Sequence, residues 1–109
     1  MTLDDILAQA KDLEIFERRS FSAEYCELVF FSQDLEAWFR ILTDSLGEPK
    51  KPAGQEPTKA DLGITSQTGG IRINQTLFEK ELGEKTIIAK IWPWDDERYL
   101  TLKMAVLFN

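Results

Sequence analysis

Two segments of the chain place apolar residues at helical spacing. Over residues 2–14 they fall on one side of a short helix, and Thr2 and Asp5 have the spacing of a capping box at its start. A second helix is predicted between an N-cap at Ser32 and a stop at Gly47. The apolar positions of this second helix are Leu35, Trp38, Phe39, Leu42 and Leu46.

Strand patterns occupy most of the remaining chain. Residues 24–31 are rich in aromatic and β-branched residues on both faces, which is typical of a central strand. Further strands are predicted over 70–78, 86–94 and 98–108, with a short one over 62–65. The sequence therefore predicts an α+β fold, in which a mainly antiparallel sheet of four to five strands carries two helices on one face.

The chain predicts a single domain over residues 1–109. Its length suffices for one hydrophobic core, and no internal repeat or shift in composition divides it. Residues 48–59 contain three of the four prolines and almost no large apolar side chain, so we expect a mobile surface loop there.

The last two predicted strands form a hairpin whose faces differ. If its loop spans residues 94–97, Ile91 faces Leu100 and Trp92 faces Tyr99. The apolar side, which meets the helices, then carries Ile87, Ala89, Ile91, Leu100, Leu102 and Met104. The opposite side carries Ile88, Trp92, Trp94 and Tyr99. Two helices cover one face of such a sheet, so this aromatic face is either open or covered by another segment.

Three uses of the aromatic face stay open at this point. Its side chains pack under the Pro-rich loop or in a cross-strand ladder, or they form a dimer interface, or they line a site for a small ligand or another protein. Beside them, Arg72, Lys90 and Lys103 are candidates for contact with an anionic ligand or an acidic partner. A hairpin register shifted by one residue would exchange the two faces.

Composition removes several function classes. The chain has no histidine and one cysteine, so the usual zinc ligand sets, Ser-His-Asp triads and internal disulfides are absent. A net charge of −6 disfavours nucleic acid as a partner. The acidic N-terminus lacks the pattern of a signal peptide, and no apolar run approaches the length of a membrane span. We therefore expect a cytoplasmic protein that contacts neither membrane nor nucleic acid and needs no cofactor.

One stretch carries a family resemblance. Residues 34–47 read Asp-Leu-Glu-Ala-Trp-Phe-Arg-Ile-Leu-Thr-Asp-Ser-Leu-Gly and follow the predicted strand of 24–31. At Asp34, Leu35, Thr43, Asp44, Leu46 and Gly47 this stretch resembles the helix signature of the vicinal-oxygen-chelate superfamily, the glyoxalase and bleomycin-resistance-like proteins. The resemblance implies a βαβββ-like core over 24–108.

The same resemblance implies no metal site in this chain. Metal-dependent members of that superfamily place His, Gln or Glu on the first and last strands of each module. Here Glu27 falls near the first-strand position, but residues 100–108 contain no carboxylate and the chain has no histidine. The resemblance thus implies a fold and, at most, a cavity formed by two copies.

No residue pattern indicates catalysis. Cys26 lies mid-strand without a neighbouring cation and is expected to be a buried structural thiol, and Glu24 and Glu27 fall on opposite faces of their strand. The leading hypothesis is a small acidic, non-enzymatic α+β module that acts through protein–protein interaction as a homodimer. The alternative is a small-molecule-binding, glyoxalase-like protein with its cavity on the aromatic face.

Overall fold

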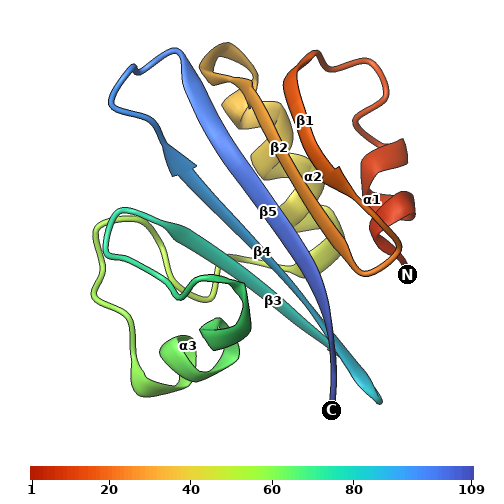
Figure 1. The fold of residues 1–109 in the computed structure, drawn as a ribbon, viewed down its shortest axis with the longest axis vertical. Helices are drawn as coiled ribbons and strands as arrows, with labels where there is room; N and C mark the ends of the chain where they lie inside the picture. The colour runs from red at the N-terminus through yellow and green to blue at the C-terminus, as the bar shows by residue number, and fades with distance from the viewer.

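A five-stranded antiparallel sheet organises the chain, and the computed structural model describes all residues from 1 to 109 (Figure 1). The spatial strand order is β1-β2-β5-β4-β3. The strands are β1 (Ile15–Phe21), β2 (Tyr25–Phe31), β3 (Thr76–Leu82), β4 (Lys85–Pro93) and β5 (Tyr99–Phe108). The helices are α1 (Leu3–Ala8), α2 (Leu35–Leu46) and α3 (Lys59–Ile64), with 3-10 turns η1 (Ser32–Asp34) and η2 (Ser66–Thr68). The predicted α+β class with an antiparallel sheet is confirmed.

The main core lies between one sheet face and the helices α1 and α2. Phe30 and Trp38 are both fully buried, with ring centroids 5.3 Å apart. The apolar side of the β4–β5 hairpin faces this core, as predicted. Cys26 is also buried there, and burial raises the pKa of its thiol to about 11. This thiol is therefore structural, as its mid-strand position indicated.

The ends of the two predicted helices need correction. α1 has the expected capping box between Thr2 and Asp5, but it ends at Ala8 rather than at residue 14. α2 ends at Gly47 as predicted, with a φ of 88° that suits glycine. Its N-cap is Asp34 rather than Ser32, because residues 32–34 first form a 3-10 turn.

Strand β1 has no counterpart among the predicted elements. It pairs with β2 as an edge strand, and all of its residues after Ile15 are exposed. Its register shifts twice, between Ile15 and Glu17 and between Arg18 and Ser20. Such bulges break the alternation of side chains, so the period-two signal of a half-buried strand is missing from this segment.

The β4–β5 hairpin has the predicted faces but a different register. Its loop spans residues 94–98, so Trp92 pairs with Thr101 rather than with Tyr99. The Tyr99 amide donates to the Asp96 carbonyl at 3.2 Å, and this turn lengthens the loop by one residue. A shift of two residues in the pairing leaves every side chain on its predicted face.

Two strand predictions between residues 58 and 78 are wrong. Residues 62–65 mostly continue helix α3, which begins with a capping box between Thr58 and Asp61. The strand expected over 70–78 begins only at residue 76, since the Arg72 amide donates to the Gln75 side chain at 2.9 Å and closes a turn.

The Pro-rich loop is not simply a surface loop, because Lys51 within it is 1% exposed. Its backbone pairs with Leu77 of β3, and its ammonium donates to three backbone carbonyls of residues 52–75. Together with α3, this segment covers the β3–β4 part of the second sheet face (Figure 1). Beneath it lies a small second core of Ile71, Leu77, Ile88 and Ala105.

Candidate functional site

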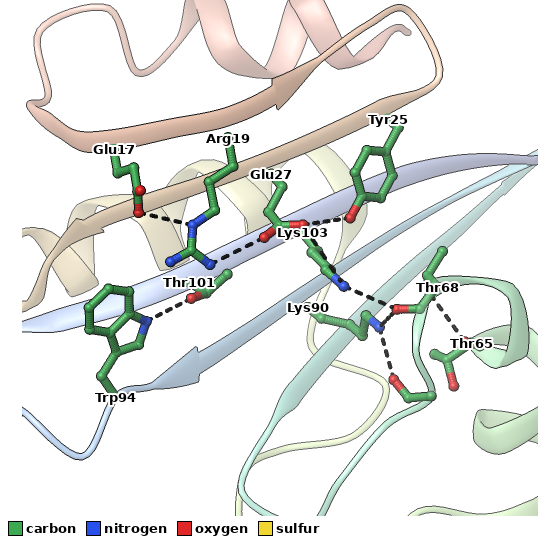
Figure 2. A network of polar contacts seen from close by, with 11 residues as sticks. Glu17, Arg19, Tyr25, Glu27, Thr65, Thr68, Lys90, Trp94, Thr101 and Lys103 are labelled. Atoms are coloured by element: carbon green, nitrogen blue, oxygen red, sulfur yellow. Dashed lines mark hydrogen bonds and ion pairs between the residues drawn. The ribbon is translucent and has the colours of Figure 1, made fainter.

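Two groups of side chains remain accessible on the second sheet face. We call the four rings of Phe16, Phe31, Trp94 and Tyr99 the aromatic cluster. We call the second group the basic pocket, a hollow of about 240 Å³. It is lined by Thr68, Gly69, Gly70, Arg72, Gln75, Lys90, Trp92 and Lys103. A chain of polar contacts runs from Arg19, whose guanidinium lies 5.5 Å from the Trp94 ring, through Glu27 to the lysines of the pocket (Figure 2).

The aromatic cluster joins β1, β2 and the β4–β5 hairpin. The Phe16 ring stacks on Tyr99 at 4.3 Å, and Phe31 and Trp94 lie 5.9 and 5.3 Å from the same tyrosine ring. The Trp94 indole donates to the Thr101 hydroxyl at 2.8 Å, which fixes the ring against the sheet. Phe16 is nevertheless 47% exposed, so the cluster forms an aromatic surface rather than part of a core.

Glu27 connects the cluster with the pocket. Its carboxylate accepts hydrogen bonds from Tyr25 at 2.8 Å and Arg19 at 3.3 Å, and the Lys103 ammonium lies 3.9 Å away (Figure 2). Burial acts to raise the pKa of Glu27, but these hydrogen bonds and the Lys103 charge outweigh it and hold the pKa below its usual range. Burial, followed by the bond to Glu27, raises the pKa of Tyr25 to about 12. Glu27 is therefore an ionised structural group and is poorly suited to act as a general acid.

Lys90 forms the floor of the basic pocket and is 2% exposed. Its ammonium donates to the carbonyls of Thr68 at 2.6 Å and Gly70 at 2.8 Å (Figure 2). Gly69 and Gly70 both have positive φ, and the turn that they form directs these carbonyls toward the lysine. Burial, reinforced by the charge of Lys103, lowers the pKa of Lys90 to about 8.

The predicted site residues divide between these features. Arg72, Lys90, Trp92 and Lys103 meet in the basic pocket, whereas Trp94 and Tyr99 belong to the aromatic cluster. Ile88 was expected on the accessible face, but it is 1% exposed because the segment around α3 covers it.

Sequence reasoning missed the partners of these residues. Phe16 and Arg19 were missed because the pattern of residues 15–21 does not indicate a strand. The glycine pair indicates a turn, but nothing in the local pattern indicates that its carbonyls meet Lys90.

A second hollow, of about 410 Å³, lies between α1 and β1. Its lining is mostly apolar and includes Leu7, Ile15, Phe21 and Trp38. The indole N–H of Trp38 is buried without an acceptor. No group of three His, Cys, Asp or Glu side chains is placed to hold a metal ion, and none of the helices has the length and hydropathy that a membrane span requires.

The pKa of Lys90 predicts a rise of stability with pH. The unfolded chain holds this proton up to the ordinary value of 10.5, whereas the folded chain releases it near 8. Between these values the unfolded state binds more protons, so the free energy of unfolding increases as pH rises. Between pH 8 and 10, we expect the free energy of unfolding of wild type to rise by about 2 kcal/mol relative to that of Lys90→Met, as measured in urea titrations.

Exposed Lys80 provides the control for this prediction, because a Lys80→Met variant keeps the Lys90 proton and its stability should follow wild type across the range. The shifted pKa values of Tyr25 and Cys26 are shared by all three proteins and cancel in the differences. A difference between wild type and Lys90→Met that stays constant with pH would show that Lys90 titrates normally.

No family model, no curated protein and no solved structure matches this chain. The resemblance of residues 34–47 to the glyoxalase superfamily therefore stays a prediction.

Proposed function

We propose that this chain is a non-enzymatic binding module that self-associates through the aromatic cluster. The observation that carries the proposal is the accessible packing of four rings from three strands and a hairpin loop, with Phe16 about half exposed on top of Tyr99. Aromatic pairs contribute about 0.5–1.5 kcal/mol each beyond the area that they bury, so a second set of rings packed on the first is a substantial source of affinity.

Neither edge of the sheet is suited to pairing with a strand of another chain, which favours a contact through the sheet face. The edge strand β1 contains two bulges within seven residues, and bulges of this kind blunt an edge against pairing with another chain. At the other edge, Lys51 already pairs with Leu77 of β3. The addition of a strand from another chain is thus disfavoured at both edges of the sheet.

The charges around the aromatic cluster suit a second copy of the same chain. Arg19 lies 5.5 Å from the Trp94 ring and Arg98 lies 5.4 Å from the Tyr99 ring. Acidic Glu17, Asp95 and Glu97 are close by in β1 and the hairpin loop. In a two-fold contact, a residue away from the axis meets a different residue of the partner, so a rim that carries both signs of charge can pair with itself.

Light scattering behind a sizing column tests this proposal. Wild type is expected to show twice the monomer mass of 12.5 kDa at high concentration and to dissociate on dilution. Phe16→Glu should remain monomeric, because it places a charge at the centre of the contact. Phe108→Glu is the matched control, since Phe108 is 66% exposed at the end of β5, outside the cluster.

Two outcomes would refute self-association at the cluster. The first is a wild-type monomer up to about 1 mM, a concentration at which even a weak specific dimer is populated. The second is a dimer that Phe16→Glu and Phe108→Glu leave equally intact, since the contact would then lie elsewhere.

A further inference from the structure

We propose that the basic pocket binds a small oxyanion, a carboxylate or phosphate group, between Arg72, Lys90 and Lys103. This site is separate from the aromatic cluster and goes beyond self-association. Three cationic side chains line the pocket and no carboxylate does, in a protein whose net charge is −6. This concentration of one sign is what an anion site requires.

The cations of the pocket are only partly neutralised by the protein. Lys90 donates two of its three N–H groups to backbone carbonyls, and no protein acceptor takes the third. Lys103 makes two long contacts, with the Thr68 carbonyl at 3.5 Å and with Glu27 at 3.9 Å, and Glu27 is already bonded to Arg19 and Tyr25. Donors for an incoming anion are therefore already in place.

Arg72 completes the pocket from the loop before β3. Its guanidinium makes no hydrogen bond or ion pair with the protein, while its backbone amide is fixed by the Gln75 side chain at 2.9 Å. An arginine held at the backbone and free at its tip is suited to bidentate contact with an oxyanion.

Structural roles explain only part of this arrangement. Lys90 fastens the turn at Thr68 and Gly70 to the sheet, and this accounts for its two bonds. Lys103 reaches the same Thr68 carbonyl only through a long bond of 3.5 Å, and it lies close enough to lower the pKa of Lys90 further. Two ammonium groups that repel each other at one hollow are stabilised by an anion between them.

The size and lining of the pocket define the ligand class. A hollow of about 240 Å³ is smaller than typical sites for whole drug-sized ligands, so it fits a head group or a small ion. Trp92 is the one hydrophobic residue of the lining, and the Lys103 ammonium lies 5.8 Å from its ring. We expect any larger ligand to place its anionic end at the lysines and an apolar part against Trp92.

The test is an NMR titration of the isotope-labelled protein with sodium phosphate and, separately, with sodium acetate. Sodium chloride keeps the ionic strength constant at pH 7. For at least one oxyanion, the amide signals of Gly69 and Gly70 and the Trp92 indole signal are expected to shift and saturate. Comparison of the two anions shows whether the pocket prefers phosphate or carboxylate.

Two double variants make the test specific. Arg72→Gln with Lys103→Gln is expected to weaken binding by at least about tenfold, as two charged hydrogen-bonding groups are lost. Arg40→Gln with Lys80→Gln changes the net charge equally at exposed positions outside the pocket and should bind like wild type. Arg72 is exposed and Lys103 is partly exposed, so neither change removes a core contact.

A pH series adds an independent readout. The affinity for acetate, which stays a monoanion over this range, should fall several-fold between pH 7 and 9.5, because Lys90 loses its proton near pH 8. The other charged groups that face Lys90 are Arg72, Lys103 and Glu27. Glu27 stays ionised throughout, because its pKa lies below its usual range.

The proposal is overturned if neither oxyanion gives a saturable shift beyond the chloride control up to about 50 mM. It is also overturned if the two double variants weaken binding equally, because net charge rather than the pocket would then determine it. An acetate affinity that does not change between pH 7 and 9.5 would show that the Lys90 ammonium takes no part in binding.

Discussion

Replacement of Phe30 by alanine is expected to cost about 3–5 kcal/mol of stability, because it removes a large ring from the centre of the main core. Phe30 is fully buried in β2, which pairs with β1 on one side and β5 on the other. Its ring lies 5.3 Å from that of Trp38, so the truncation leaves a cavity between the sheet and α2. A small domain typically has about 5–15 kcal/mol of stability, so this loss brings the chain close to unfolding.

Urea unfolding followed by circular dichroism measures this effect. Phe108→Ala is the control, because this ring is 66% exposed and its loss should cost less than about 0.5 kcal/mol. A loss below about 1 kcal/mol for Phe30→Ala would mean that α2 moves in to fill the cavity, and the packing of α2 on β2 would then be loose.

The parts of the fold that the sequence predicts well share one property, a long and regular pattern. Strand β2, helix α2 and the β4–β5 hairpin each carry apolar side chains at the spacing of their element. Gly47 marks the end of α2 through its positive φ. Even the wrong hairpin register keeps the correct faces, because the error is an even number of residues.

The missed elements are short or irregular. Helix α3 has six residues, and its strongest signal is the capping box of Thr58 and Asp61 rather than an apolar stripe. Strand β1 is an edge with two bulges, and six of its seven residues are exposed. Tertiary contacts decide the structure of such segments, so local patterns carry little information about them.

In the candidate site, too, residues with a clear local pattern were predicted and long-range contacts were missed. Arg72, Lys90 and Lys103 are predicted together with Trp92 because they flank the aromatic residues of the hairpin, and the fold does bring them to one pocket. The turn that holds Lys90 could not be predicted, because its carbonyls come from a segment about 20 residues earlier in the chain. Phe16 of β1 was missed because residues 15–21 show no strand pattern, and Phe31 of β2 was missed because its ring partner Tyr99 lies far away in the chain.

Lys51→Met is the second substitution with a large expected effect, about 3–5 kcal/mol on the segment that covers the second sheet face. Lys51 donates to the carbonyls of Pro52 at 3.0 Å, Ile73 at 3.1 Å and Gln75 at 2.6 Å, so every ammonium proton is used. Burial lowers its pKa, and the charge of Asp61 acts in the opposite direction. Methionine keeps the apolar stem but leaves the three carbonyls without their shared donor.

Hydrogen exchange locates this effect. The Gly54 amide donates to the Ile73 carbonyl at 2.7 Å and should exchange at least about a hundredfold faster in Lys51→Met, whereas amides of the β2–β5 pair should be unchanged. Exposed Lys59 of α3 supplies the control, because its ammonium makes no hydrogen bond or ion pair and Lys59→Met should cost less than about 0.5 kcal/mol.

Comparison of the two variants thus separates the effect of a buried structural charge from that of a surface charge. Equal and small effects of Lys51→Met and Lys59→Met would show that the Pro-rich segment is held by other contacts. Faster exchange confined to Lys51→Met would instead show that one buried ammonium holds residues 52–75 over the sheet. This segment also provides the Thr68 and Gly70 carbonyls, which accept hydrogen bonds from the Lys90 ammonium. Its opening should therefore disassemble the basic pocket while the aromatic cluster stays in place.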